Sequence, residues 1–155
     1  MQRAVAILVL TLAAAVPHAV AGDTSGAWVY VARGSYWSNN DLPKEFSLTI
    51  DMKFSHDRLT YSSVNDTDKS KIGRLEFVAP LDGTVVPIEN QPRYNQVSVR
   101  RTEDDGLEII QYKDGDVIVG SFYTFLSDGK TLVRCGVGKA QDGKSKAYRE
   151  YFVRK

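Results

Sequence analysis

The sequence contains one cysteine, Cys135, and two histidines, His18 and His56. A single cysteine cannot form a disulfide within the chain, which excludes a small fold stabilised by internal disulfides. So few cysteines and histidines also cannot supply the ligands of a His/Cys zinc site, and we expect no metal and no cofactor. The stability of the chain must therefore come from an apolar core and a hydrogen-bonded backbone.

An excess of charge is also missing, because 20 Lys and Arg residues stand against 19 Asp and Glu residues. Proteins that bind nucleic acids or anionic membranes through general electrostatics carry a basic excess or a basic face. The balanced composition disfavours both functions, and we expect no nucleic-acid partner.

Long apolar runs are absent after the first twenty or so residues, so we expect no membrane span. The N-terminal segment has one positive charge at Arg3, an apolar run over residues 4–16 and the small-residue triplet 19–21. This three-part layout is typical of a secretory signal peptide over residues 1–21, cleaved after Ala21. Removing 21 of 155 residues leaves 134, a suitable size for one domain over 22–155 in a periplasmic or extracellular protein.

What the chain does have is β-strand patterning punctuated by Asp-Gly. Three runs rich in Val, Ile, Tyr and Phe, at 107–113, 116–126 and 131–137, are joined by Asp114-Gly115 and Asp128-Gly129. Asp-Gly tolerates the positive φ angles of tight hairpin turns, so these runs predict a three-stranded antiparallel meander.

Residues 45–54 show the clearest alternation in the chain. Five apolar residues fall on one face of this segment and polar residues on the other, which indicates a strand with one buried face. The five are Phe46, Leu48, Ile50, Met52 and Phe54. Further strands are predicted at 26–32, 58–64, 72–79, 84–86, 94–101 and 146–153, with loops at 34–44 and 65–71. We therefore predict an all-β protein, an antiparallel barrel of about 8–10 strands with meander topology.

Several short motifs follow one another in an order that carries a resemblance. They are Gly26-x-Trp28, Leu81-Asp-Gly-Thr-Val-Val-Pro87, Gln96-Val-Ser-Val-Arg-Arg101, Val119-Gly120 and Ser127-Asp-Gly-Lys-Thr-Leu132. Over residues 26–155 the chain resembles small secreted bacterial lipocalin-like proteins, which are calycin-type β-barrels. The resemblance implies a barrel and export but supplies no catalytic residue and no ligand. It also implies that Trp28 closes one barrel end under an arginine of a late strand, Arg149 or Arg154, whereas Cys135 departs from the family.

A cavity inside the barrel is the first place to look for function. Trp28 can contact a ligand there, although a structural plug at the closed end is favoured. The apolar face formed by Phe46, Leu48, Ile50, Met52 and Phe54 can line a cavity for a small ligand or can simply fill the interior. Alternation identifies the buried face and leaves both alternatives open.

The surface offers two candidates for binding a protein partner. Tyr36 and Trp37 are large aromatics in a predicted polar loop, where they either cap the barrel or contact a partner, and capping is favoured. The strand 116–126 has Val117, Val119, Tyr123 and Phe125 on one face and Ile118, Phe122 and Leu126 on the other. Its outer face is therefore either covered by a neighbouring loop or layer, the favoured alternative, or available to a partner.

Catalytic chemistry has little support in the sequence. His56 and Asp57 can form an acid/base pair but fall in a predicted turn, and no Gly-x-Ser-x-Gly motif is present. The acidic turns at 103–105 and 114–116 lack the ligand spacing of a calcium loop. Asn65-Asp-Thr67 is a glycosylation acceptor pattern, and Cys135, with Val133 and Val137, is predicted to face inward as a small apolar residue.

We therefore expect an exported, monomeric, non-enzymatic protein that binds a small apolar ligand in a lipocalin-like barrel. The alternative is a secreted inhibitor or envelope interaction protein that acts through exposed loops, with Tyr36, Trp37 and residues 87–92 as its contact surface.

Overall fold

The structure, a computed structural model, describes residues 24–89, 91–102, 106–140 and 142–155. The predicted signal peptide lies outside these residues. The described chain contains no α-helix, and hence no helix with the length and apolarity that a membrane crossing requires. Its ten strands are β1 (Gly26–Trp37), β2 (Leu48–Phe54), β3 (Arg58–Asn65), β4 (Gly73–Pro80), β5 (Asp82–Pro87), β6 (Gln96–Arg101), β7 (Leu107–Lys113), β8 (Asp116–Phe125), β9 (Thr131–Lys139) and β10 (Ser145–Arg154).

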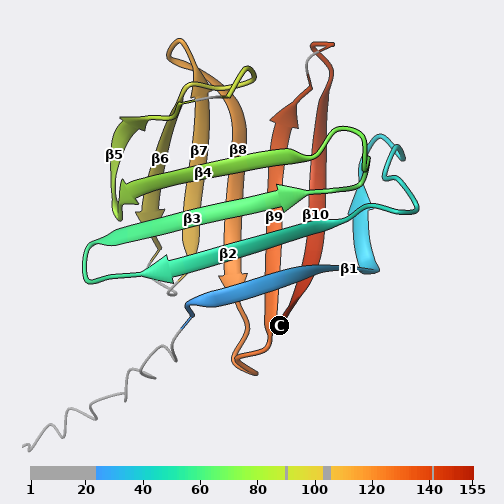
Figure 1. Ribbon diagram of the computed structural model, residues 1–155, viewed down its shortest axis with the longest axis horizontal. Coiled ribbons are helices and arrows are strands. Elements are labelled where there is room, and N and C mark those ends of the chain that lie inside the picture. The colour runs from blue at the N-terminus through green and yellow to red at the C-terminus, as the bar shows by residue number, and fades with distance from the viewer. Residues whose placement is uncertain (1–23, 90, 103–105, 141) are drawn as a thin grey trace, which may run out of the picture.

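The ten strands form one antiparallel sheet in the order β4-β3-β2-β1-β10-β9-β8-β7-β6-β5. Figure 1 shows the sheet folded over itself, with β2, β3 and β4 running across the strands β6 to β10. Strands β4 and β5 are the two edges of the sheet, and no hydrogen-bonded ladder joins them within the described residues. The protein is thus a nearly closed antiparallel barrel with meander connections, which confirms the predicted fold class.

Strand β1 belongs to both layers because it bends in its middle (Figure 1). Its first half pairs with β2, and its register with β10 shifts between Val31 and Tyr36. Gly34 has a φ of 82° at the bend, and the Ser35 hydroxyl donates to the Val31 carbonyl at 2.7 Å. The predicted loop over 34–44 was therefore wrong at its start, since a glycine and a hydroxyl that look like turn residues instead hold a bulge inside a strand.

The hairpin turns follow the Asp-Gly prediction. Asp114 and Gly115 have φ angles of 52° and 87°, the paired positive values of a type I′ turn between β7 and β8. Gly129 and Gly143 also have positive φ, at 64° and 83°, in the next two hairpins. Asp105, in a fourth Asp-Gly pair, lies outside the described residues.

One end of the barrel, called here the packed end, is filled by apolar side chains. Ile50, Met52, Leu59 and Phe152 have no exposed surface there, and Trp28 is 1% exposed. The guanidinium of Arg154 lies 5.2 Å from the Trp28 ring, and Arg154 donates to the Ser25 carbonyl at 2.7 Å. Arg154, and not Arg149, is therefore the late-strand arginine over the tryptophan.

The inward face of β9 differs from the prediction. Leu132 is buried, and the inner face continues with Arg134, so Val133, Cys135 and Val137 point outward. Val137 is 57% exposed and Cys135 is partly exposed. Because β9 has apolar residues on both faces, its sequence does not indicate which face is buried. The inner face also carries an arginine, which is paired inside the barrel.

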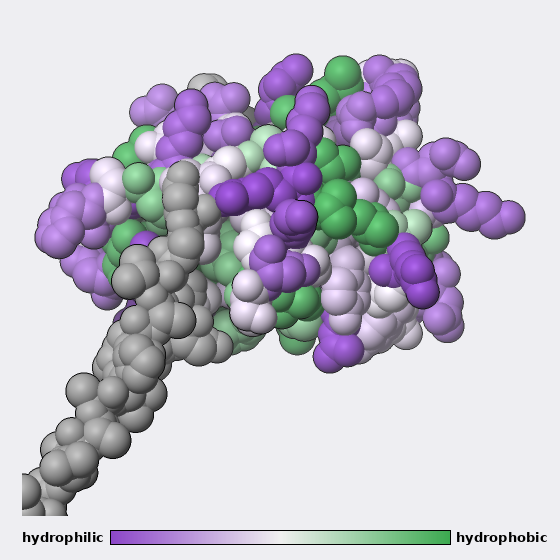
Figure 2. Space-filling model, turned by 90° about the horizontal axis from the view of Figure 1, so that it is seen from below, coloured by the Kyte–Doolittle hydropathy of each residue, from purple (hydrophilic) through white to green (hydrophobic). Residues whose placement is uncertain are grey.

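The outer face of β8 is also exposed rather than covered. Phe122 and Leu126 are 51% and 40% exposed. A bulge in β8 opposite Tyr112 also turns the Val117 side chain outward. On the face seen from below, hydrophobic side chains lie between hydrophilic ones (Figure 2).

Candidate functional site

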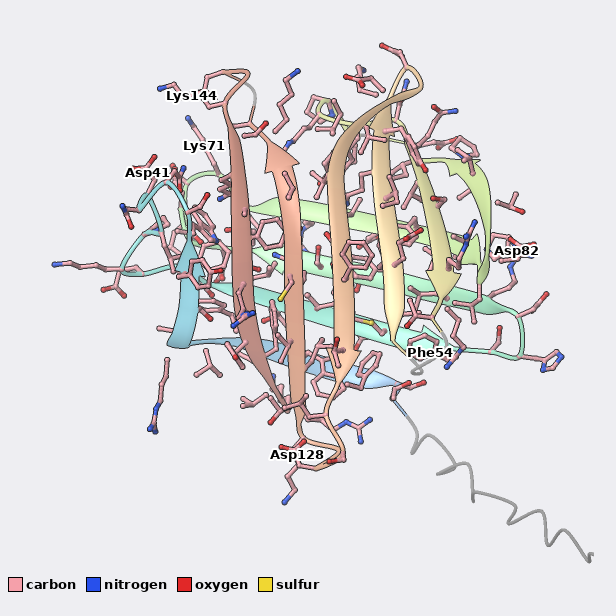
Figure 3. The ribbon with its side chains drawn as sticks, turned by 180° about the vertical axis from the view of Figure 1, so that it is seen from behind. Asp41, Phe54, Lys71, Asp82, Asp128 and Lys144 are labelled. Atoms are coloured by element: carbon pink, nitrogen blue, oxygen red, sulfur yellow. The ribbon has the colours of Figure 1, made fainter. Side chains whose placement is uncertain are left out.

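The end of the barrel opposite the packed end contains a cavity of about 280 Å³. Residues at the end of β3, the start of β4, the segment before β6, the end of β9 and the start of β10 are among those that line it. Figure 3 shows that the loops carrying Asp41, Lys71 and Lys144 gather at this end, whereas Phe54 lies at the other. The cavity therefore opens toward the loops, where a ligand can enter.

Aromatic rings form much of the cavity wall. Trp37 and Phe46 pack edge to face with centroids 5.2 Å apart, and Phe46 also contacts Tyr30 at 4.7 Å. The other aromatic lining residues are Tyr61, Tyr94, Tyr123 and Tyr148. A planar or apolar group can thus stack within the cavity.

A buried ion pair lies in the cavity wall. Glu150 of β10 is 2% exposed and sits directly opposite Arg134 of β9, whose Nε donates to Oε2 of Glu150 at 2.9 Å. The Trp37 indole Nε1 donates to Oε1 of the same carboxylate at 2.8 Å. Both carboxylate oxygens are therefore occupied by donors of the protein.

Arg134 is held in its charged form by this environment. Burial is the largest single effect and disfavours the guanidinium charge, but the Glu150 carboxylate and the surrounding tyrosines together outweigh it and raise the pKa of Arg134 well above its usual value. The guanidinium also lies 5.4 Å from the Tyr148 ring and 5.6 Å from the Phe152 ring. Arg134 and Glu150 together contribute no net charge to the cavity.

The tyrosine hydroxyls of the wall are bonded within the protein. Tyr148 and Ser121 hydroxyls lie 2.6 Å apart, and those of Tyr61 and Tyr123 lie 3.4 Å apart. Burial raises the pKa of Tyr148 to about 12 and that of Tyr61 well above its usual value. Tyr61 and Tyr148 are therefore neutral hydrogen-bonding groups at physiological pH.

Two more cations, Arg93 and Lys146, line the cavity with partly buried side chains, and Arg74 is a further lining residue whose side chain is exposed. The Nε of Arg93 is buried and has no hydrogen-bond partner in the part of the chain that the structure describes, while its Nη2 donates to the Lys139 carbonyl. Burial lowers the pKa of Lys146 from 10.5 to about 8, and Arg93 and Arg134 add to the effect, against the opposing charges of Glu150 and Asp41. Apart from Glu150, no acidic residue is among the lining residues that the structure describes.

The predicted ligand-binding residues divide between the two ends. Phe46 and Leu48 line the cavity, whereas the others, Trp28, Ile50, Met52 and Phe54, are not among its lining residues and pack in the core. The apolar face of residues 46–54 thus both lines and fills the barrel. Whether any of these side chains contacts a ligand stays a prediction.

Tyr36 and Trp37, predicted together as a partner-binding pair, point to opposite sides of β1. Trp37 faces the cavity, and Tyr36 is 50% exposed on the outer surface. Tyr36 joins Phe122, Cys135 and Val137 along a shallow groove on the outer face of β8, β9 and β10.

The remaining candidates lie apart from the cavity or serve local structure. His56 is exposed in the turn between β2 and β3, at the packed end. Asp114 accepts a hydrogen bond from Asn95 at 2.8 Å, and residues 103–105 lie outside the described residues. Asn65 ends β3 and accepts from the Thr67 amide at 3.1 Å. No cluster of three or more His, Cys, Asp or Glu residues suited to a metal occurs in the described part of the chain.

Sequence reasoning missed the charged half of this site. Arg134, Glu150, Arg93 and Lys146 were not predicted as site residues, because charged side chains are usually exposed. The available signal was the spacing of Lys146, Tyr148, Glu150 and Phe152, which places two charged residues on the face of a buried phenylalanine.

Known protein structures share this fold at low sequence identity. The siderocalin Ex-FABP, described as having dual ligand specificities, superposes with a TM-score of 0.51 at 15% identity, over 86% of this chain and 74% of its own. The apo form of lipid binding protein 8 of Caenorhabditis elegans gives 0.50 at 15% identity, over 86% and 96%. Zebrafish ileal bile acid-binding protein, complexed with cholic acid, gives 0.51 at 11% identity, over 86% and 98%.

No protein-family model matches the sequence, and no curated protein matches it. The structural likeness establishes the fold, which is that of the lipocalin-like, calycin-type barrels.

Proposed function

We propose that this protein is an exported, non-enzymatic binding protein for a small acidic ligand with an aromatic or short apolar body. The observation that carries the proposal is the imbalance of charge around the cavity. Arg93 and Lys146, both partly buried, add to a wall whose carboxylate, Glu150, is already paired with Arg134. An anion is the ligand that compensates Arg93 and Lys146, since buried charge is costly unless paired.

The size of the cavity supports a small ligand. Its volume of about 280 Å³ lies just below the roughly 300–1,000 Å³ typical of small-molecule pockets. The aromatic wall suits the body of such a ligand, and the buried, unpartnered Nε of Arg93 suits its acidic group. The sequence predicted an apolar ligand, and the cavity narrows that class to ligands with an apolar body and one acidic group.

The proposal that the protein is not an enzyme and the proposal that it is exported rest on different observations. The polar groups deep in the cavity are bonded to one another, and His56 lies at the other end of the barrel, so no acid/base pair converges on the cavity within the described residues. Export rests on the signal-peptide pattern of residues 1–21.

The first experiment is native mass spectrometry of the protein purified from the cells that make it, which detects a retained ligand. Calorimetry then compares para-substituted benzoates and short-chain fatty acids with their amides. We expect the acids to bind at least tenfold more tightly than the amides, and Arg93→Gln to weaken acid binding. Arg58→Gln, at an exposed position of β3, is the matched control. Equal binding of acids and amides, or binding of neither, would refute the proposal.

A second candidate function is favoured by the outer groove. Tyr36, Phe122 and Val137 are each at least half exposed and lie together over β1, β8 and β9. Exposed apolar clusters of this kind occur at protein interfaces. Replacing Phe122 and Val137 with serine would abolish capture of a protein partner while leaving ligand binding in the cavity unchanged.

A further inference from the structure

Lys146 occupies a distinct position on the cavity wall. It shares the inner face of β10 with Tyr148 and Glu150, and residues two apart on a strand are separated by roughly 7 Å along it. Lys146 is therefore the outermost of three polar residues that lead from the opening into the barrel. A ligand that enters the cavity passes its amine.

The two inner residues are hydrogen-bonded within the protein, whereas Lys146 contacts only an aromatic ring among the described residues. Glu150 is bonded to Trp37 and Arg134, and Tyr148 to Ser121. Within the described residues the Lys146 ammonium has no hydrogen bond or ion pair and lies over the Trp37 ring. The amine is therefore available to a ligand.

The surroundings of Lys146 favour a neutral amine more than those of a surface lysine do. Partial burial of the side chain is the main cause that lowers its pKa, Arg93 and Arg134 lower it further, and the opposing attraction of Glu150 and Asp41 does not restore the ordinary value. With its pKa lowered to about 8, roughly a tenth of the amine is unprotonated at pH 7. For an ordinary lysine that fraction is smaller by more than a hundredfold.

We propose that Lys146 binds a carbonyl group of the acidic ligand covalently and reversibly, as an imine. The inference rests on the proposed function, because the cations of the cavity hold the acid while the amine meets an aldehyde or ketone on the same molecule. The ligand class is thus narrowed to small oxo-acids or aldehyde-acids.

The chemistry needs no further reactant. The Lys146 nitrogen lone pair adds to the carbonyl carbon, and the carbonyl π electrons move to oxygen, which takes up a proton. The nitrogen loses its two protons in total, the oxygen takes up a second proton, the C–O bond breaks and one water leaves, so that a C=N bond replaces C=O. Water at the cavity opening can accept and deliver these protons.

The test uses para-carboxybenzaldehyde, which carries both groups, and sodium cyanoborohydride, which reduces an imine to a stable amine. We expect one adduct on the intact protein by mass spectrometry, and peptide mapping places it on Lys146. Lys146→Arg, which keeps the positive charge, should lower the adduct at least tenfold. Lys144→Arg, at an exposed position beside it, should leave the adduct unchanged.

Noncovalent binding is measured in parallel with para-methylbenzoate, which cannot form an imine. If para-methylbenzoate binds but the adduct is spread over surface lysines, or persists in Lys146→Arg, the imine proposal is overturned and the proposed function stands. If neither compound binds, the proposed function is refuted as well. A labelling rate that rises to half its maximum near pH 8 supports Lys146, whereas a midpoint near pH 10 indicates ordinary surface lysines.

Discussion

Glu150 and Arg134 are charges in the barrel wall that depend on each other. Each is largely removed from water, with side-chain exposures of 2% and 16%. Removing one partner of such a pair leaves the other charge buried and uncompensated, whereas removing both does not.

Glu150→Gln keeps an acceptor for the Trp37 indole but removes the charge that balances Arg134. We expect the free energy of unfolding to fall by about 3 kcal/mol, as measured by urea denaturation. The double variant Arg134→Met/Glu150→Leu should be less destabilised than Glu150→Gln alone. Glu76→Gln, on the exposed face of β4, should change stability little. A double variant more damaged than the single one would contradict this interpretation.

Lys146 should make acid binding depend on pH. Its protonated form attracts an anion, and with a pKa near 8 the amine loses its charge as pH rises from 7 to 9. The affinity for a non-carbonyl acid should therefore fall about two- to fivefold over this range, which calorimetry can measure. In Lys146→Arg the guanidinium stays charged, so the affinity should stay constant. A similar decline in both proteins would assign the titration to another group.

At the scale of the strand, β9 and β10 depend on close approach at Gly136. A Cβ at this position would lie 2.2 Å from the Gly120 carbonyl oxygen and 2.5 Å from the Tyr148 hydroxyl. The ring of Tyr148 thus occupies the space where a side chain would be, and the backbone of β8 cannot move away without breaking its ladder.

Gly136→Ala should lower the free energy of unfolding by about 1–3 kcal/mol, as overpacking generally does, when measured by thermal or urea denaturation. Gly73→Ala is the matched control on β4, where a Cβ would meet Asn65 at an ordinary 3.6 Å. We expect Gly73→Ala to be near neutral. Equal effects of the two variants would show that the contact at Gly136 does not limit packing.

Alternation and Asp-Gly turns were sufficient to predict most strands but not always which side of a strand is buried. The prediction for β9 failed because of the length of the loop between β9 and β10. Five residues, 140–144, lie between the two strands, and with this loop length Arg134 and not Cys135 pairs with Glu150. A turn of two residues at Asp142-Gly143 would have paired Cys135 with Glu150. One residue of register reverses the faces of a whole strand, and loop length is difficult to predict from sequence.

The same reversal occurs in β1. Pairing with β10 runs from Val31↔Tyr151 to Tyr36↔Arg149, so three extra residues lie on β1 between these pairs. This odd number turns Trp37 inward and Tyr36 outward. The site was therefore predictable where apolar residues define it, at Phe46 and Leu48. It was not predictable where bulges and loop lengths bring charged residues inward.

The molecule as a whole is a barrel with one open seam between β4 and β5. Every other neighbouring pair of strands forms a ladder, from β3–β4 through β1–β10 to β5–β6. The two edge strands have backbone groups without a ladder partner on one side, whereas β9 and β10 are paired on both.

Hydrogen exchange should follow this difference. We expect amides of β4 and β5 to exchange faster than those of β9 and β10 when measured by mass spectrometry on peptic peptides. The control within the same data is β2, which is paired on both sides and should be protected. Protection of β4 and β5 equal to that of β10 would mean that the seam is closed in solution.

Ligand binding should stabilise the whole barrel. A ligand at a hundred times its dissociation constant adds about 2.7 kcal/mol to the unfolding free energy. For a domain of this size, that corresponds to a rise in Tm of roughly 5–10 °C. Differential scanning fluorimetry with an acid and its amide measures the shift, and Arg93→Gln should reduce it for the acid.

The two tryptophans lie at opposite ends of the barrel, Trp28 among apolar side chains and Trp37 beside charged groups. The chain therefore contains two natural optical probes of different events. Indole emission responds to the polarity and charge of its surroundings, so a protein with only Trp37 reports on what enters the cavity. A protein with only Trp28 reports on whether the packed end has melted. The same fluorescence experiment can thus separate occupancy from folding within one molecule.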